Sequence, residues 1–200
     1  MLFRSPSSLA TVFSSSTGDP SNCHLLCEAL AAPERLVSPT RFTNSVHNAP
    51  AGYWHIAAQS RAASTSLAAF DASFAAGLLE AAVQCTATGQ AVLLVACDVP
   101  YPEPLHTVRP VADVFAVALL LCPAAAAAGG RGLSLQTVPS GASPAPLITR
   151  CDHPGLEAAR RGIPAARALP LLQALAGNRA ADVLIEGLSD MALQVQVAPS

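Results

Sequence analysis

The chain has 200 residues, which is long enough for one domain with a hydrophobic core. It is 52% hydrophobic and only 12% charged, and its 11 basic residues, all Arg, stand against 13 acidic ones. A net charge of -2 gives no electrostatic footprint for nucleic acid, so that class of partner is excluded. So few charges predict either an unusually alanine-rich surface or a surface that a partner covers. We expect a single domain over residues 1–200.

The first half of the sequence alternates strand and helix patterns. Leu9–Phe13 reads as a strand, and Asp19 followed by Pro20 is typical of the start of a helix, which we expect to run to about Ala31. A short helix is predicted over Gly52–Gln59 and a second strand over Thr65–Phe70. These elements favour an α/β fold.

A long, nearly uncharged helix is predicted over Ala72–Thr88, with Gly89 ending it. Because such a helix has apolar or small residues on nearly all sides, it belongs in the interior. The apolar run Ala91–Cys97 follows, typical of a strand covered on both faces.

The second half predicts a hairpin of residues 114–121 and 132–138, a helix over 165–176, and short strands over 183–185 and 193–197. Proline is densest at 100–110 and 139–164, where we expect loops. The expected fold class is therefore α/β with a mixed sheet and a buried central helix.

The apolar window Val114–Ala128 is the one place to consider a membrane span. Asp113 precedes it, Pro123 interrupts it, and it is shorter than the roughly 20 residues that a span needs. We interpret it as a buried strand followed by an alanine-rich loop. The first residues lack an apolar run of signal-peptide length, so the prediction is a cytoplasmic protein with no membrane partner.

Six cysteines occur without a C-x-x-C motif. Cys23 and Cys27 lie four residues apart on one predicted helix face and, with His24, are a conceivable metal site. The alternative is that they are small buried hydrophobes in a reducing compartment. We favour the second interpretation and predict no metal and no cofactor.

The segment from Asn44 to Asp98 resembles the nucleophile region of the β-ketoacyl synthases. In that family a glycine-bearing helix and a short strand lead into a cysteine at the start of a buried helix. When the sequence is aligned without gaps, the family's catalytic cysteine falls on Asp71; the matching positions are Gly52, Ile56, Arg61, Ser64, Ala68 and Ser73. The run from Ser38 to Trp54 is most similar to one branch, the short chain-length factors of aryl polyene biosynthesis.

This resemblance implies the N-terminal half of a thiolase-like fold, here without the family's first strand and helix. It also implies that the catalytic apparatus is absent. The family's second half supplies two histidines that decarboxylate the malonyl thioester, and none of the five histidines here lies in those motifs. We predict no catalytic residue.

Asp71 has two possible roles in its own right. It can cap the helix over 72–88 by accepting from the amides of Ser73 or Phe74, or it can act as a base or decarboxylation aid. A carboxylate stabilised at a helix N-terminus is a poor nucleophile towards a thioester.

The other candidate residues are assigned to an acyl tunnel or a subunit interface. His47 and Asn48 either shape such a tunnel or stabilise their loop through hydrogen bonds. Tyr53 is a further tunnel or interface candidate, although Tyr53 and Trp54 are more often core aromatics than acyl-chain contacts. The remaining tunnel or interface candidates are Gly52, Ser64, Ser66, Ala68, Phe70 and Ser73.

The sequence therefore predicts a catalytically silent chain-length-factor subunit. Family resemblance implies a heterodimer with an active β-ketoacyl synthase, formed through the strand from Ser64 to Phe70, and delivery of the chain by acyl carrier protein. Two alternatives stay open: a decarboxylase or acyltransferase that acts on carrier-bound acyl groups through Asp71 or Ser73, and a truncated reading frame that does not fold.

Overall fold

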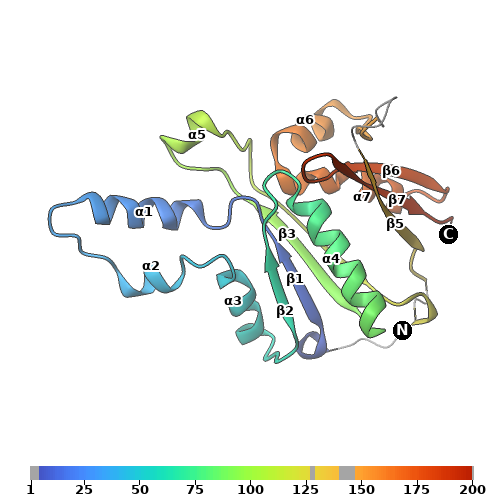
Figure 1. Ribbon diagram of the computed structural model, residues 1–200, viewed down its shortest axis with the longest axis horizontal. Coiled ribbons are helices and arrows are strands. Elements are labelled where there is room, and N and C mark those ends of the chain that lie inside the picture. Colours follow the sequence, from blue (N-terminus) through green and yellow to red (C-terminus); the bar gives the residue numbers. More distant parts are fainter. Residues whose placement is uncertain (1–4, 127–128, 140–146, 200) are drawn as a thin grey trace.

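The computed structural model describes residues 5–126, 129–139 and 147–199. Its strands form two sheets, one of four strands in the order β2-β1-β3-β4 and one of three in the order β5-β7-β6 (Figure 1). The predicted α/β class with a mixed sheet and a central helix is confirmed. The second sheet is a feature that the sequence pattern did not predict.

The four-stranded sheet is mixed. Its strands are β1 (Ala10–Ser14), β2 (Ser64–Leu67), β3 (Val92–Asp98) and β4 (Phe115–Leu121). β1 pairs in parallel with both β2 and β3, and β4 is antiparallel to β3. As a result β1, β2 and β3 all end at the same edge of the sheet, and this edge carries the candidate site.

The central helix α4 (Ser73–Thr88) packs on β1 and β3. Phe74, Leu78 and Ala81 are fully buried in a core that also includes Val12 and Leu94. Gly77 allows the close approach, because a Cβ there would lie 2.7 Å from the Ser14 Cβ atom. Gly89 ends the helix with φ +64°, as predicted. Val83 is 54% exposed, so the helix is interior on one side and not on all sides.

The second sheet corrects the expected hairpin. β5 (Leu133–Pro139) does not pair with β4, its neighbour in sequence. It pairs antiparallel with β7 (Met191–Val197), which also pairs with β6 (Ala181–Glu186). β4 is an edge strand whose residues alternate between half-buried and exposed, so the expectation of a fully buried strand is also wrong.

Helical segments join the two sheets. Pro154 begins α6 (Pro154–Gly162) inside the proline-rich region that was expected to be a loop, and residues 140–146 of that region lie outside the described residues. The predicted helix over 165–176 is a 3-10 segment, η3 (Pro164–Ala168), that continues into α7 (Leu169–Ala176). A short helix, α5 (Leu105–Val108), interrupts the other proline-dense loop. Two further 3-10 turns are η1 (Pro6–Ser8) and η2 (Ala124–Ala126).

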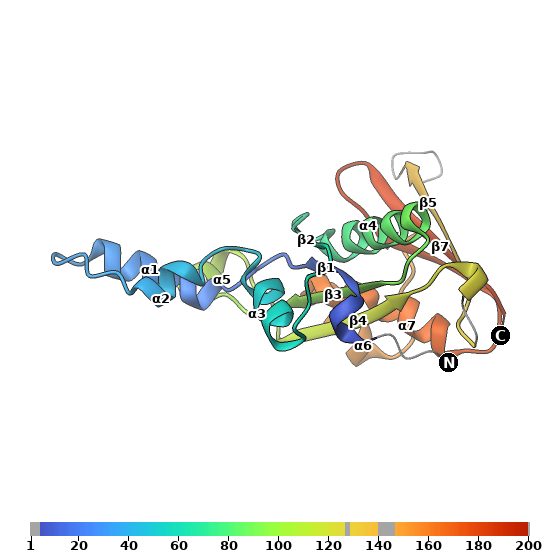
Figure 2. The same cartoon turned by 90° about the horizontal axis from the view of Figure 1, so that it is seen from below.

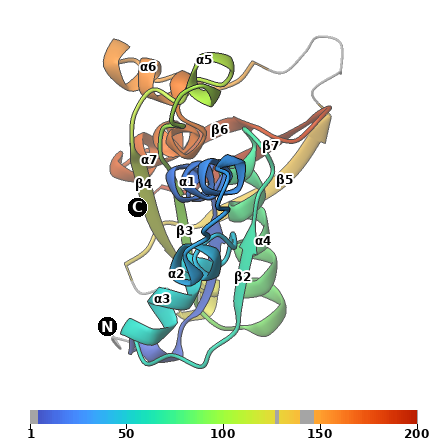
Figure 3. The same cartoon turned by 90° about the vertical axis from the view of Figure 1, so that its left-hand side faces the viewer.

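Three helices form an arm that projects from the body between β1 and β2 (Figures 1 and 2), and Figure 3 looks along it toward the sheets. They are α1 (Pro20–Ala31), α2 (Pro39–Thr43) and α3 (Ala49–Ala57). Asp19 caps α1 as predicted, by accepting from the Asn22 amide at 2.9 Å. Large apolar side chains are exposed along the arm: Leu25, Leu30, Leu36, Phe42, Val46, Tyr53 and Ile56.

Among the described residues, no helix has both the length and the apolar character needed to span a bilayer.

Candidate functional site

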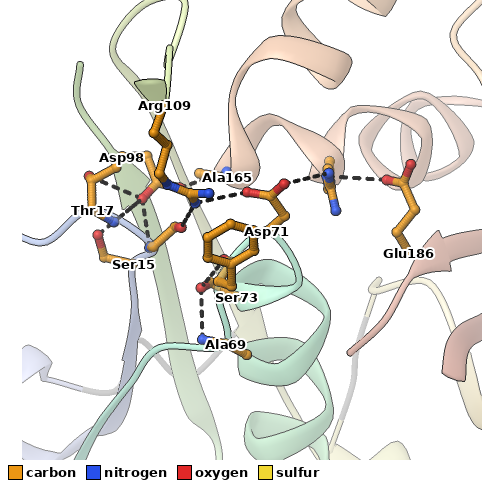
Figure 4. A network of polar contacts seen from close by, with 12 residues as sticks. Ser15, Thr17, Ala69, Asp71, Ser73, Asp98, Arg109, Ala165 and Glu186 are labelled. Carbon is orange, nitrogen blue, oxygen red and sulfur yellow. Dashed lines mark hydrogen bonds and ion pairs between the residues drawn. The ribbon is translucent and has the colours of Figure 1, made fainter. Parts of the chain in front are cut away.

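The carboxyl ends of β1 and β3 are held together by a buried carboxylate, that of Asp98. Its Oδ1 accepts from the backbone amides of Ser16 at 2.7 Å and Thr17 at 3.0 Å, and from the hydroxyl of Ser15 at 3.1 Å. Its Oδ2 accepts from the Ala165 amide in η3 at 2.8 Å (Figure 4). Asp98 is only 1% exposed, so these donors replace the water that a buried carboxylate loses.

Asp71 lies in the tight turn between β2 and α4. Phe70 precedes it with φ +51°, an uncommon conformation for a non-glycine residue. A single bridge joins Ala69 and Asp71 across this turn. The predicted strand over Thr65–Phe70 therefore ends early, at Leu67, and Phe70 belongs to the turn.

The capping role expected for Asp71 is wrong. The N-cap residue of α4 is Ala72, and it makes no side-chain capping bond. The Asp71 carboxylate instead accepts from Arg109 Nη2 at 2.9 Å and from Arg167 Nη2 at 3.4 Å (Figure 4). The guanidinium groups approach from segments 38 and 96 residues away in the chain, and draw the carboxylate away from the helix amides.

Arg109 is held in place from two further directions. Its Nη2 also donates to the Ser16 hydroxyl at 2.7 Å, and its guanidinium carbon lies 3.5 Å from the centroid of the Phe70 ring. Stacking on an aromatic face orients a planar guanidinium. The strained Phe70 turn therefore positions both Asp71 and its cationic partner.

A chain of ion pairs continues from Asp71 toward the second sheet. Arg167 Nε lies 3.2 Å from a Glu186 oxygen, without good hydrogen-bond geometry, and Arg160 Nη1 donates to Glu186 at 3.1 Å. Arg160 also donates through Nε to Glu157 at 2.8 Å. This bond, with a second from the Cys151 amide, lowers the pKa of Glu157 to about 2. The bond to Glu157 raises the pKa of Arg160 from its already high ordinary value. Asp71 thus belongs to a network that joins the two sheets.

Ser73 is 1% exposed and its hydroxyl is fully used in the turn. The hydroxyl donates to the Phe70 carbonyl at 2.7 Å and accepts from the Ala69 amide at 3.0 Å. Ser73 is therefore the residue that closes the turn before α4. Among the described residues, no general base contacts its hydroxyl.

Of the other predicted site residues, some lie at the same edge of the sheet as Asp71 and others lie on the arm. His47 reaches the same edge of the sheet, where its Nε2 donates to the Ser15 carbonyl at 3.1 Å. Asn48, Gly52 and Tyr53 lie on the exposed side of the arm, and the Tyr53 hydroxyl donates to Asn44 Oδ1 at 2.9 Å. Tyr53 is 57% exposed, so its assignment to the core is wrong.

β2 contains two of the candidate residues, Ser64 and Ser66, and Ala68 directly follows the strand. Ser64 accepts from the Thr11 hydroxyl at 2.8 Å, which ties β2 to β1. Ala68 is exposed and Ser66 is half-buried. β2 is an edge strand, and among the described residues no strand pairs with its outer side.

The expectation that the cysteines are buried fails at three positions. Cys23 and Cys27 on α1 and Cys122 are exposed, whereas Cys85 and Cys151 are buried. Burial is the main cause that raises the pKa of the thiols of Cys85, Cys97 and Cys151, so these are not ready thiolate nucleophiles. Within the described ranges no group of three or more His, Cys, Asp or Glu side chains has metal-site geometry.

Sequence reasoning missed Arg109, Arg167 and Asp98. Their charges could have indicated them. Only 12% of the residues are charged, and a charged residue inside an apolar segment requires a partner. Which partner it finds depends on the fold.

Comparison with known proteins agrees with this architecture. The model of the β-ketoacyl synthase N-terminal domain matches residues 2–148. A ketosynthase in complex with its chain length factor, from Xenorhabdus doucetiae, is similar with a TM-score of 0.69 and 26% identity over 94% of this chain and 69% of the other. The ishigamide ketosynthase/chain length factor is similar with a TM-score of 0.66 and 15% identity, over 99% of this chain and 75% of the other. Among curated proteins no match was found.

A more distant likeness extends to the 3-oxoacyl-[acyl-carrier-protein] synthase III of Aquifex aeolicus, with a TM-score of 0.51 and 10% identity over 97% of this chain and 78% of the other. This likeness concerns the fold alone. The fold and the turn before α4 define a thiolase-like, ketosynthase-type protein. The chain belongs to the β-ketoacyl synthase N-terminal domain family.

Proposed function

We propose that this protein is a non-catalytic chain-length-factor subunit that pairs with an active β-ketoacyl synthase. Aryl polyenes are the proposed product class, with acyl carrier protein delivering the growing chain, in the cytoplasm. The single observation that carries the proposal is the pairing of the Asp71 carboxylate with Arg109 and Arg167. By sequence resemblance, Asp71 stands where the family has its cysteine.

Two guanidinium groups at this position oppose covalent catalysis. A carboxylate that accepts from both has its lone pairs engaged and would have to break those bonds to attack a thioester. The neighbouring Ser73 hydroxyl is buried and bonded within its turn. These contacts of the described residues therefore favour the silent subunit over the alternative, an enzyme that uses Asp71 or Ser73.

The outer edge of β2 is the proposed surface for pairing with the ketosynthase. The Ala63 and Leu67 carbonyls accept from β1. Because successive residues of a strand point their backbone groups to opposite sides, Ser64 and Ser66 present theirs to the open edge. An open strand edge is a template for pairing with another chain.

The arm supplies apolar surface next to that edge, since α3 leads into β2. Ile56 of α3 is 75% exposed, and Phe42 of α2, further out along the arm, is 67% exposed. Exposed apolar area of this kind is costly in water and marks a surface for association. A bulkier residue at Ala68, beside the proposed interface, is expected to shorten the acyl chain made by the complex.

Co-expression with a candidate ketosynthase tests the proposal. Ser66→Pro removes an outward backbone donor while leaving the pairing of β2 with β1 in place, so it should abolish co-purification and co-elution in sizing. Gln173→Ala, an exposed change in α7 far from β2, is the control and should leave the complex intact.

A second measurement tests whether the Ser66→Pro chain still folds. The circular dichroism of the Ser66→Pro chain should match that of the wild type. A complex that survives Ser66→Pro would place the interface elsewhere and remove the support for the tunnel.

A further inference from the structure

A small polar cavity of about 240 Å³ opens beside Asp71. It lies between the turn before α4, the loop after α5 and the junction of α6 with η3. Its charged lining consists of one carboxylate, Asp71, and three guanidinium groups, those of Arg109, Arg161 and Arg167. Positive charge therefore exceeds negative charge in the wall by two.

The three arginines are not equally engaged. Arg109 and Arg167 each give one Nη2 hydrogen bond to Asp71, and Arg167 also faces Glu186. Arg161 is exposed at the cavity, and its side chain makes no ion pair or hydrogen bond with any described residue. Each guanidinium carries five N–H donors, so donors remain available in all three.

The backbone adds positive potential at the same place. α4 begins at Ser73, two residues after the lining residue Asp71, and has no side-chain cap, so the positive end of its dipole lies near the cavity. Glu186 faces Arg167 from outside the lining and also pairs with Arg160, so Arg161 is the lining guanidinium that has no carboxylate of a described residue within ion-pair distance. A second anion is the group that would complete the site.

We propose that this cavity binds a phosphate group, held by Arg161 together with the free N–H groups of Arg109 and Arg167. This site is independent of the proposed pairing with a ketosynthase. The lining holds three guanidinium groups and one carboxylate, which favours an anion, and guanidinium groups bind phosphate oxygens in a bidentate manner. A carboxylate supplies one charge and two oxygens, so it should bind less tightly.

Titration calorimetry of the full chain, alone or in its complex, with inorganic phosphate and in parallel with acetate at matched ionic strength, tests the proposal. Phosphate should bind, and acetate should bind at least about tenfold more weakly. Glycerol phosphate distinguishes a phosphate ester from free phosphate, because only a site open to solvent accepts the ester.

Two substitutions should act in opposite directions. Arg161→Ala removes no ion pair or side-chain hydrogen bond to a described residue. It should weaken phosphate binding about tenfold, the loss expected for one charge-assisted hydrogen bond. Asp71→Asn removes the competing negative charge and should strengthen it. Arg61→Ala, an exposed arginine outside the cavity lining with the same charge change, is the control and should leave binding unchanged.

The outcomes are decisive in each case. The proposal is overturned if phosphate gives no binding heat, if acetate binds as tightly as phosphate, or if Arg61→Ala weakens binding as much as Arg161→Ala. Arg161→Ala decides the question even if Asp71→Asn fails to fold, because Arg161 is exposed and unpaired among the described residues.

Discussion

Asp98 at the end of β3 accepts a hydrogen bond from the backbone amide of Ala165, 67 residues further along the chain, at 2.8 Å. The same carboxylate accepts from the amides of Ser16 and Thr17 after β1. One buried side chain therefore fixes the carboxyl edge of the first sheet to the segment that leads into the second.

Asp98→Asn should destabilise the protein by about 3 kcal/mol or more, because the new amide NH2 would face backbone donors and the charge-assisted bonds would be lost. Urea unfolding measures the change. Asp190→Asn, which alters an exposed aspartate, should change the stability by less than about 0.5 kcal/mol. Equal stability of Asp98→Asn and wild type would refute the role of Asp98 as a link.

Gly77→Ala in α4 and Gly52→Ala in α3 are expected to change the free energy of unfolding in opposite directions. At Gly77 the new Cβ would lie 2.7 Å from the Ser14 Cβ atom and 3.0 Å from Leu94 Cδ1, so a loss of about 1–3 kcal/mol is expected. At Gly52 nothing lies within 4 Å, and the higher helix propensity of Ala should add up to about 1 kcal/mol. Thermal unfolding compares the two; a gain at Gly77 would contradict the close packing of α4.

Arg131 is expected to stabilise the end of α7. Its guanidinium donates to the carbonyls of Ala174, Leu175, Gly177 and Arg179, and its Nε to that of Ala198. Arg131→Ala should cost about 2 kcal/mol by leaving these acceptors without their donor, and Arg131→Lys should recover only part, since an ammonium lacks the planar fork. Chemical denaturation with Arg61→Ala as the control checks this; full recovery by Lys would show that charge alone suffices.

The ion pair between Glu157 and Arg160 is expected to make the stability of the fold sensitive to acid. The pKa of Glu157 is lowered from 4.5 to about 2, first by the hydrogen bond from Arg160. A group with a depressed folded-state pKa stabilises the fold above its unfolded pKa, and loses that contribution as the pH falls through the folded value. Stability should therefore decline between pH 4.5 and about 2.

Glu157→Gln should flatten this part of the pH profile of the unfolding midpoint, whereas Glu34→Gln, at an exposed carboxyl group, should preserve it. An unchanged slope in Glu157→Gln would mean that other groups cause the acid sensitivity.

Asp71→Cys is expected not to give malonyl-dependent condensation by the chain alone. The substitution places a thiol where, by sequence resemblance, the family has its cysteine, but Arg109 and Arg167 contact the side chain at this position and none of the five histidines lies in the family's catalytic motifs. Radiolabelled condensation product is the measurement, with an active ketosynthase as the positive control. Product formed by the Asp71→Cys chain would overturn the assignment of a silent subunit.

Three elements of the first half were correctly predicted from local signals. Asp19 and Pro20 fix the start of α1, Gly89 ends α4 with a positive φ, and the apolar run after Gly89 is β3. Caps, turn glycines and apolar periodicity act over a few residues, so the sequence contains them directly. The resemblance to β-ketoacyl synthases likewise depended on a contiguous stretch and placed Asp71 in the turn before the central helix.

Pairings between distant segments could not be predicted in this way. β4 and β5 are neighbours in sequence and both have strand patterns, yet β5 pairs with β7, because a strand's partner is chosen by the packing of the whole sheet. The sequence by itself determined that Asp71 precedes a buried helix. The capping role expected from local preference is not the one that Asp71 has in the structure. Only the tertiary structure brings Arg109 and Arg167 to that carboxylate, and two charge-assisted hydrogen bonds then outweigh a single bond to a helix amide.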